Sequence, residues 1–352
     1  MRYIQIDGSM GEGGGQVLRT SLTLSMLYQM PIEISNIRAG RNKPGLLRQH
    51  LTCVLAAAEI SSAQVEGAEL GATRLRFAPG SVKAGEYHFA VGSAGSTALV
   101  CQTVLLPLAL TGQGSRVIFE GGTHNMAAPS LTFLTQSFLP LLAQQGLNTK
   151  VTLDRVGFYP AGGGRWQLDI DGVASLAPLR VAPEKETENS TLTAVAMISK
   201  LANKIGEREI TQLEKSLRRS PLGDVNVSGR VESVESIGPG NMLLLTAKSY
   251  HHAHVFEMAG SYGVKAEAVA KRVAGRYCEF YEAEAEVEHY LADQLLLPLL
   301  VGGAGAFITS VPSGHLQTNV ALIRQLTGKP LTLTPHGESR FGAPRWQVAL
   351  SR

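Results

Sequence analysis

The chain has 352 residues and a mass of 37.5 kDa, which suits two or three domains. Hydrophobic residues make up 44% and charged residues 17%, so a mainly disordered chain is excluded. The 32 basic and 29 acidic residues give a formal net charge of +3, which permits a nucleic-acid partner without implying one. Cys53, Cys101 and Cys278 have no disulfide or zinc spacing, which favours a reducing compartment.

The sequence contains no signal peptide or membrane segment that we can identify. The start, MRYIQIDGSMGEGGG, lacks an apolar stretch, and the most apolar run, residues 295–308, is interrupted by Pro298 and three glycines. We therefore predict a soluble cytoplasmic protein with no membrane partner.

In chain order, three segments carry apolar residues four apart, which predicts helices that pack one face on a sheet. They are Leu18, Leu22 and Met26; Val100, Val104 and Leu108; and Leu291, Leu295 and Leu299. A second helix is predicted after each, announced by Pro44, Pro129 and Pro312, with Leu47, Leu51 and Leu55; Leu134 and Phe138; and Leu316, Val320 and Ile323. Short β-type runs between them, such as 3–6, 75–77, 87–91, 117–120 and 166–170, predict a small sheet under each helix pair.

The spacing of these proline signals predicts the domain organisation. Pro44 and Pro129 lie 85 residues apart, whereas Pro129 and Pro312 lie 183 apart, so 98 residues are left over. Three repeats with one insertion fit these distances, although chance spacing of leucine would leave the same marks. We predict a large α/β domain over 1–184 and 286–352 and a small α/β domain over 185–285, in which 242–247 is a strand and Val269, Val273, Tyr277 and Phe280 mark a helix.

A glycine-rich turn, Gly11-Glu12-Gly13-Gly14-Gly15-Gln16, precedes the first predicted helix and its Arg19. Glycine lets backbone N–H groups approach phosphate oxygens at a helix N-terminus. A glutamate in such a turn suits phosphate binding only with a divalent cation between them, which makes Glu12 a candidate Mg²⁺ ligand. A flexible surface turn is the alternative.

Two further loops could bind anions. Residues 38–48 carry four cations, including Arg38 and Arg41, and arginine can bind phosphate in a bidentate manner, but a solvated basic loop is the common explanation. Residues 92–97 resemble the first turn without its carboxylate, so they are either an anion site or an N-capped helix start. Residues 155–164, RVGFYPAGGG, suit either a ligand-facing loop with an exposed aromatic pair or a plain hairpin connection.

His315 follows Pro312-Ser313-Gly314 at the predicted start of the last helix. Positive potential there lowers the pKa of an imidazole and keeps it a neutral nucleophile, although a capping or core histidine is the alternative. The group His251, His252 and His254 lacks a regularly spaced fourth metal ligand, so we expect a solvated strand there rather than a metal site.

Six of these segments together resemble the RNA 3′-terminal phosphate cyclase family, of the bacterial type. They are GEGGGQVLRTSLTLS, RAGRNKPGLLRQH, GSAGSTALVCQT, GFYPAGGG, EHYLADQLLLPL and PSGHLQTN, in family order from Gly11 to Asn319, with a weaker match over about 185–285. The resemblance implies three repeated units, each a four-stranded sheet with two helices, and an inserted small domain of thioredoxin-like topology.

The resemblance also implies an activity. The family uses ATP and a divalent cation, Mg²⁺ or Mn²⁺, to convert an RNA 3′-phosphate end into a 2′,3′-cyclic phosphate. A histidine becomes adenylylated, AMP passes to the RNA 3′-phosphate, and the neighbouring 2′-hydroxyl expels AMP. The relay replaces one difficult displacement by easier ones.

Carried over residue by residue, the resemblance implies His315 as the nucleophile, Glu12 near the metal, and Arg19, Arg38 and Arg41 near the phosphates. It places Gln102, Pro129, Tyr290, Leu291, Ala292, Asp293 and Gln294 in the ATP site. Tyr290 and Pro129 are expected to sandwich adenine, and Asp293 to orient the His315 imidazole. Many members of the family have a second proline where this chain has Ser130, so the chain departs from the family pattern at the expected adenine wall.

Two other functions are weighed against the cyclase. A catalytically silent RNA-binding or ribosome-assembly factor would lack the nucleophile, which is present here. An enolpyruvyl transferase would share the repeated fold but not the six motifs. The expected partner is an RNA 3′-phosphate end; the oligomeric state is not decided by the sequence, and a homodimer is one arrangement it allows.

Overall fold

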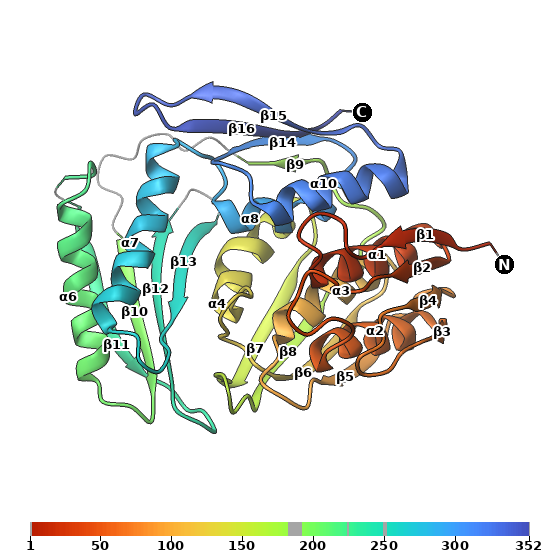
Figure 1. Cartoon of the computed structure of the whole chain (residues 1–352), viewed down its shortest axis with the longest axis horizontal. Coiled ribbons are helices and arrows are strands. Elements are labelled where there is room, and N and C mark those ends of the chain that lie inside the picture. The colour runs from red at the N-terminus through yellow and green to blue at the C-terminus, as the bar shows by residue number, and fades with distance from the viewer. Residues whose placement is uncertain (1, 182–191, 224, 249–251, 352) are drawn as a thin grey trace.

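The computed structural model describes residues 2–181, 192–223, 225–248 and 252–351. The described chain has a mixed α/β fold with four four-stranded sheets and helices packed on them (Figure 1). The predicted α/β class is confirmed. The predicted start of the insertion, residue 185, lies outside the described residues. Among those described, no helix combines the length and the apolar character needed to span a bilayer.

In all four sheets a parallel pair is followed by two antiparallel strands, and three of the sheets also share one chain order, in which the fourth strand lies between the second and the third. The first has the order β1 (Ile4–Asp7), β2 (Ile32–Ser35), β4 (Leu75–Ala78), β3 (Gln64–Glu66). The second has the order β5 (Glu86–Ala90), β6 (Ser115–Gly121), β8 (Gly164–Ile170), β7 (Thr149–Arg155). The third has the order β9 (Leu179–Arg180), β14 (Gly305–Thr309), β16 (Pro344–Leu350), β15 (Leu331–Glu338).

The helices that accompany these sheets meet in the middle of the molecule. They are α1 (Gly15–Tyr28), α2 (Arg48–Ser61), α3 (Thr97–Ala109), α4 (Leu131–Phe133), the π-helical turn Leu134–Phe138, α5 (Leu139–Gln144), α8 (His289–Gln294), α9 (Leu296–Val301) and α10 (Gly314–Thr327). Helix α1 contacts α2, α3 and α10. Its predicted apolar positions, Leu18, Leu22 and Met26, are buried, as are Val100, Val104 and Leu108 of α3.

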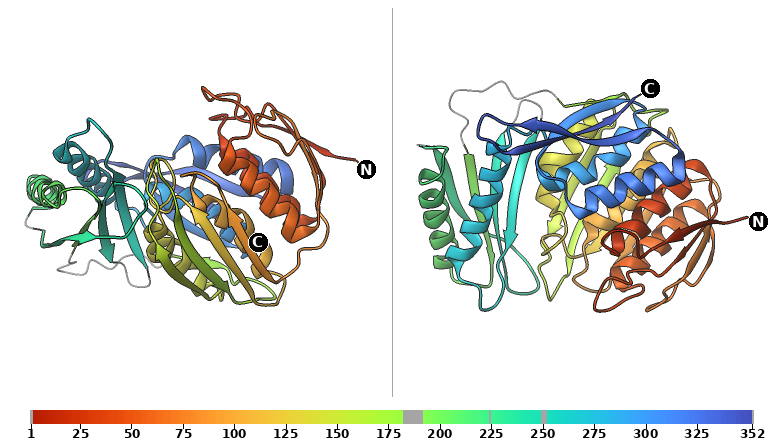
Figure 2. Two further views of the ribbon diagram at one scale, coloured as in Figure 1. Left: turned by 90° about the horizontal axis from the view of Figure 1, so that it is seen from below. Right: turned by 45° about the horizontal axis from the view of Figure 1, so that its top comes forward.

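The fourth sheet has a different connectivity and its own core. Its order is β11 (Val227–Ser233), β10 (Leu192–Ser199), β12 (Gly240–Lys248), β13 (Ala253–Ala259), with α6 (Lys204–Arg218) and α7 (Ala266–Glu282) packed on it. We call these four strands and two helices the β10–β13 unit. The residues expected to mark a helix here, Val269, Val273, Tyr277 and Phe280, are buried in that core. Figure 2 shows the unit at one end of the molecule, and its strand β13 contacts α4 and the π-helical turn that follow β6.

Proline divides two of the helices that apolar spacing predicts as continuous. Leu291, Leu295 and Leu299 are buried, but they belong to the two short helices α8 and α9. Pro298 has no N–H to donate to the carbonyl of residue 294, so the helix is interrupted there. Pro140 likewise follows the π-helical turn that separates α4 from α5.

Three predictions about burial were wrong. In α2 the stripe Leu47, Leu51 and Leu55 does not form the core face, because Leu47 and Leu55 are exposed and the helix buries Cys53, Val54, Ala57 and Ile60 instead. His252 and His254 are buried rather than solvated, and His251 lies outside the described residues. In the loop between β7 and β8 Tyr159 is exposed as expected, but Phe158 is buried against the β10–β13 unit, where a Cβ on Gly240 would reach its ring. The buried face of α2 was mispredicted because two faces of this short helix carry similar apolar content, and the elements packed against it decide which face is buried.

Two matched leucine truncations should distinguish the buried face of α1 from the exposed face of α2. We expect Leu22→Ala to reduce the free energy of unfolding by about 2–5 kcal/mol, because Leu22 is fully buried. Leu55→Ala should change it by no more than about 0.5 kcal/mol, because that side chain is 52% exposed. Urea unfolding followed by circular dichroism measures both, and equal losses would contradict the assignment of the α2 face.

Candidate active site

The glycine turn before α1 packs directly against the first turns of α10. Gly11 has a φ of 59°, and a Cβ there would lie 1.9 Å from Thr318 Oγ1. A Cβ on Gly314 would lie 2.9 Å from Glu12 Cγ. Glycine is therefore required on both sides of this contact, and the close approach brings Glu12 to the start of α10.

Glu12 connects a histidine and an arginine from two distant segments. Its Oε2 lies 2.9 Å from His315 Nδ1 and 3.3 Å from Arg41 Nη2. Ser313 caps α10 by accepting a hydrogen bond from the backbone N–H of Leu316 at 2.9 Å, which fixes the backbone that carries His315. The three charged side chains are partly exposed, so the group is accessible to a ligand.

The surroundings of His315 favour its neutral form. Burial lowers the pKa of this imidazole below its ordinary value, and the positive charges of Arg19, Arg41 and His289 act in the same direction. The carboxylate of Glu12 opposes them by stabilising the imidazolium. A neutral imidazole with one nitrogen directed at a carboxylate can act as a nucleophile through the other nitrogen.

His315 borders a cavity of about 390 Å³ that lies between the β10–β13 unit and the rest of the chain. One wall comes from the loop at 125–129 and from Phe133, and another from Glu288, Tyr290, Asp293 and Gln294 of the α8 region. The β10–β13 unit supplies Met242, Val255, Phe256, Glu257, Met258, Ala259 and Arg276. The walls are mainly apolar with a few polar groups, which is typical of a small-molecule site.

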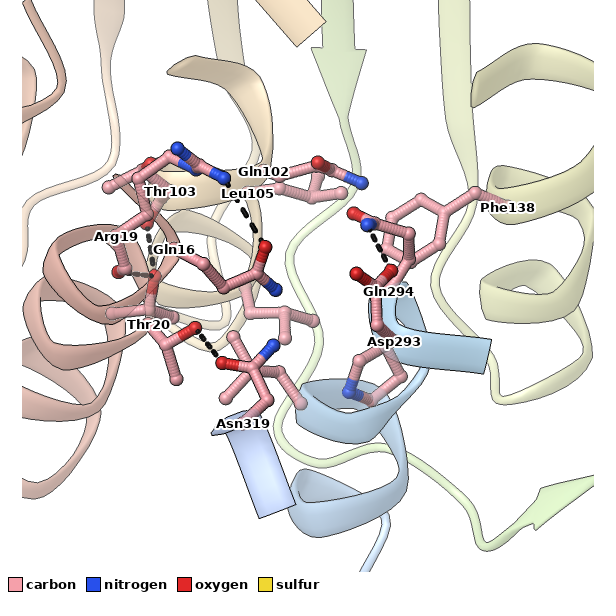
Figure 3. A pocket seen from close by; sticks show the side chains of 14 residues that line it. Gln16, Arg19, Thr20, Gln102, Thr103, Leu105, Phe138, Asp293, Gln294 and Asn319 are labelled. Carbon is pink, nitrogen blue, oxygen red and sulfur yellow. Dashed lines mark hydrogen bonds between the residues drawn. The ribbon is translucent and has the colours of Figure 1, made fainter. Parts of the chain in front are cut away.

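A second cavity of about 40 Å³, lined by both polar and apolar side chains, adjoins the first and shares Gln16, Arg19, Asp293 and Gln294 with it (Figure 3). Figure 3 shows Arg19 and Gln16 of α1 facing Asp293 and Gln294 of α8, with Gln102 of α3 and Asn319 of α10 completing the rim. Gln16 Oε1 accepts a hydrogen bond from Arg19 Nη2 at 3.4 Å. The Nε2 of Gln102 is buried and has no hydrogen-bond partner among the described residues, so a ligand or water could accept a hydrogen bond from it here.

Three carboxyl groups around the larger cavity have raised pKa values. Burial raises the pKa of Glu288 to about 8 and the pKa values of Glu257 and Asp293 to about 7. Glu288 also accepts hydrogen bonds from the N–H groups of Tyr290 and Leu291 and so caps α8. Burial in turn lowers the pKa of the Arg19 guanidinium, which Asp293 partly offsets. Near neutral pH these walls therefore hold less negative charge than their composition indicates.

The structure brings together most of the residues that the sequence singled out. Glu12, Arg41 and His315 contact one another, and Arg19, Pro129, Tyr290, Asp293 and Gln294 line the large cavity. Gln102 lines only the small one. Leu291 and Ala292 are fully buried in α8, where they pack rather than face the cavity.

Two details differ from expectation. Arg38 is buried, with a φ of 56°, and its Nη1 donates to the carbonyls of Lys43 at 2.6 Å and Gly45 at 2.8 Å, so this guanidinium braces its own loop. The carboxylate at His315 Nδ1 is that of Glu12 and not that of Asp293, whose Oδ1 accepts a hydrogen bond from Gln294. Packing of the glycine turn on α10 explains why Glu12 and not Asp293 contacts the imidazole of His315, because it brings Glu12 to the start of α10.

Several residues at the site carried no signal in the sequence. Glu257 and Arg276 lie in a region of weak family resemblance and reach the cavity only because the β10–β13 unit folds against it. Gln16 and Asn319 were inside quoted motifs, but their types alone do not distinguish a site residue from a helix-surface residue. His50 is buried beneath the glycine turn, where burial and the charges of Arg19 and Arg38 lower its pKa to about 3.

The described residues do not form a protein-only metal cage. No group of three or more His, Cys, Asp or Glu side chains in the described part of the chain could hold a metal ion. Mg²⁺ commonly takes only one or two carboxylates and completes its shell with water and substrate phosphates. Glu12, with guanidinium groups beside it, fits that single-carboxylate role.

The fold and this site define a mixed α/β protein whose ligand cavity is bordered by a histidine held by a carboxylate. A family model described as RNA 3′-terminal phosphate cyclase matches residues 10–333. The chain is 47% identical over 324 residues to the RNA 3′-terminal phosphate cyclase of Salmonella agona, covering 92% of each chain. It is 45% identical to that of Koribacter versatilis, covering 92% of this chain and 90% of the relative, and 44% identical to that of Ralstonia nicotianae, covering 98% and 97%. The chain belongs to the RNA 3′-terminal phosphate cyclase family, which is a family of enzymes.

The contacts of His315 predict that replacing Glu12 or Arg41 by uncharged glutamine shifts the pKa of His315 in opposite directions. Glu12→Gln should lower the pKa of His315, because it removes the negative charge that stabilises the imidazolium. Arg41→Gln should raise it by removing a nearby positive charge. Titration of the imidazole by ¹H–¹⁵N NMR, assigned with His315→Ala, measures both, and Glu66→Gln in β3 is the control. A rise in Glu12→Gln would contradict the assigned geometry.

The raised pKa of Asp293 predicts that its contribution to the free energy of unfolding falls as pH rises. Its folded pKa of about 7 lies above the ordinary 3.8, so the folded state keeps a proton that the unfolded state releases, and this contribution is lost as pH rises through about 7. We expect Asp293→Asn, which cannot titrate, to gain stability relative to the wild type between pH 5 and 7, by at most about 1.4 kcal/mol per pH unit. Urea unfolding at several pH values measures the difference.

The control for this titration is Asp169→Asn on strand β8, a carboxyl whose pKa is held below its ordinary value by its hydrogen bond from Arg116. Its difference from the wild type should stay nearly constant over the same range. A constant difference for Asp293→Asn as well would show that this carboxyl does not titrate near neutral pH.

Proposed function

We propose that this protein converts an RNA 3′-terminal phosphate into a 2′,3′-cyclic phosphate at the expense of ATP, with His315 as the adenylate carrier. The observation that carries the proposal is the contact between His315 Nδ1 and Glu12, at the edge of a cavity that also contains Arg19. Because Nδ1 faces the carboxylate, Nε2 is the nitrogen available for attack.

In the first step the Nε2 lone pair attacks the α-phosphorus of ATP. A P–N bond forms, the bond to the bridging oxygen breaks, and pyrophosphate leaves. Arg19 and Arg41 lie near enough to His315 for their charges to lower its pKa, and they would balance the charge of the phosphate chain. Glu12 holds the neutral ring at Nδ1 and stabilises the positive charge that develops on it.

In the second step an oxygen of the RNA 3′-phosphate attacks the same phosphorus and the P–N bond breaks, giving an RNA-adenylate and regenerating His315. In the third step the 2′-hydroxyl of the terminal ribose attacks the activated 3′-phosphorus, loses its proton to solvent or a base, and expels AMP. An anhydride-linked AMP is a far better leaving group than a phosphate oxygen, which is why adenylylation precedes ring closure.

The remaining predicted roles follow from the positions of the side chains. Tyr290 and Pro129 both border the large cavity, and we propose that adenine lies between them. Glu12 would hold the divalent cation, which supplies charge neutralisation for the phosphates when bound. Asp293, Gln294 and Gln102 would hydrogen-bond the nucleotide or its ordered water.

We also propose a domain division. The shared strand order of the first three sheets supports three repeated units. The order β11-β10-β12-β13, with α6 between β10 and β11 and α7 after β13, is that expected of a small thioredoxin-like insertion. On this reading the large domain covers 1–184 and 286–352, and the insertion covers 185–285.

Incubation with α-labelled ATP and Mg²⁺ or Mn²⁺ tests the proposal. We expect one label per chain, labile to acid and stable to base as a P–N bond requires, and at least about a hundredfold less label in His315→Ala. The same labelled protein should pass AMP to an RNA with a 3′-phosphate. His336→Ala, an exposed histidine on β15, is the matched control and should label normally.

Undiminished label in His315→Ala would overturn the assignment of the nucleophile. Absence of label in the wild type, together with RNA binding, would favour the silent RNA-binding factor instead.

A further inference from the structure

The β10–β13 unit forms one wall of the large cavity. Val255, Phe256, Glu257 and Met258 of β13 and Arg276 of α7 line it together with Pro129 and Tyr290. Pro129 and Tyr290, between which we place adenine, therefore lie outside the β10–β13 unit, whereas the adjoining wall of the cavity belongs to that unit. The width of the slot depends on how firmly these parts are joined.

Ser130 joins them on the Pro129 side. Its backbone N–H donates to Glu257 Oε1 at 2.9 Å, and its hydroxyl donates to Glu257 Oε2. Ser130 is fully buried, and its Oγ also accepts from the N–H of Phe133 at 3.0 Å, so it caps α4 as well. Two hydrogen bonds from one buried residue to one carboxyl leave little freedom for either partner.

Arg276 joins them on the Tyr290 side. Its Nη1 donates to the backbone carbonyl of Glu257, and its guanidinium carbon lies 5.0 Å from the centre of the Tyr290 ring. A cation over an aromatic face at this distance is attractive. The contacts form a continuous chain, Ser130–Glu257–Arg276–Tyr290, which crosses twice between the β10–β13 unit and the rest of the protein.

We propose that this chain of contacts is a latch that fixes the width of the nucleotide slot, and that Ser130 and Glu257 are positioning residues for nucleotide affinity and base selection. The proposal rests on the proposed function in taking the ligand to be a nucleoside triphosphate. It assigns the β10–β13 unit a role that the sequence did not predict. Breaking the latch widens the slot and weakens base stacking, whereas the contacts of Glu12, Arg41 and His315 are left in place.

Ser130→Pro is the sharpest variant. Ser130 has a φ of −73°, which proline adopts without strain, so this change removes both donors while the backbone can remain as it is. Glu257→Gln removes the carboxylate, and Ser130→Ala removes the hydroxyl alone. Glu267→Gln is the matched control, because Glu267 accepts two hydrogen bonds from Arg208 in the same unit at 2.8 Å but does not line the cavity.

ATP and CTP binding should be measured by equilibrium dialysis in the His315→Ala background, which separates binding from adenylylation. We expect Ser130→Pro and Glu257→Gln to raise the Kd for ATP about 5- to 30-fold and that for CTP by less, because the larger base stacks more fully. Ser130→Ala should have a smaller effect, and Glu267→Gln none. With His315 present, the ATP concentration for half-maximal labelling should rise while the maximal rate stays within about threefold.

Equal weakening for ATP and CTP, or unchanged affinity in a Ser130→Pro variant with wild-type circular dichroism, would overturn the latch. If Ser130→Pro does not fold, Glu257→Gln and Ser130→Ala decide on the same readouts. Failure of the proposed function has a different signature: the wild type would carry no His315 label, while the dialysis comparison would still report on the latch.

Discussion

The contact between the glycine turn and the first turns of α10 is the constraint on which the site depends. It joins residues separated by about three hundred positions and leaves no room for a Cβ at Gly11 or Gly314. Because the backbones approach so closely, a glutamate side chain reaches the imidazole of His315 directly. His315, the carboxylate of Glu12 that contacts it and the guanidinium of Arg41 are thus positioned by backbone packing rather than by long flexible side chains, and little ordering is required when a ligand binds.

Burial adds a second property to this geometry. The same enclosure that raises the pKa values of Glu257, Glu288 and Asp293 lowers those of His315 and Arg19. The three carboxyl groups and the imidazole are therefore shifted toward their neutral forms near physiological pH, whereas the Arg19 guanidinium keeps its charge. With these carboxyls largely protonated, an anionic ligand meets less repulsion here than the residue types alone indicate.

The β10–β13 unit changes how the cavity is understood. Without it, Pro129 and Tyr290 would border an open groove, and with it they face an apolar wall that carries a carboxyl and a guanidinium. The hydrogen bonds of Ser130 to Glu257 connect this wall to the start of α4. Affinity for a nucleotide and the integrity of this interface are therefore expected to vary together.

The sequence by itself determined the α/β class and the apolar positions of α1, α3, α7 and α10, because local periodicity and glycine or proline signals are properties of neighbouring residues. The segments that meet at the site were indicated by the resemblance of six motifs to a known family. The roles assigned to His315, Glu12 and the arginines stay predictions. Only the tertiary structure decided which face of α2 is buried, that Glu12 rather than Asp293 contacts His315, and that Arg38 is engaged by its own loop. It alone also placed Glu257 and Arg276 at the cavity. Each of these depends on contacts between elements far apart in the chain, and such contacts leave no mark in local spacing.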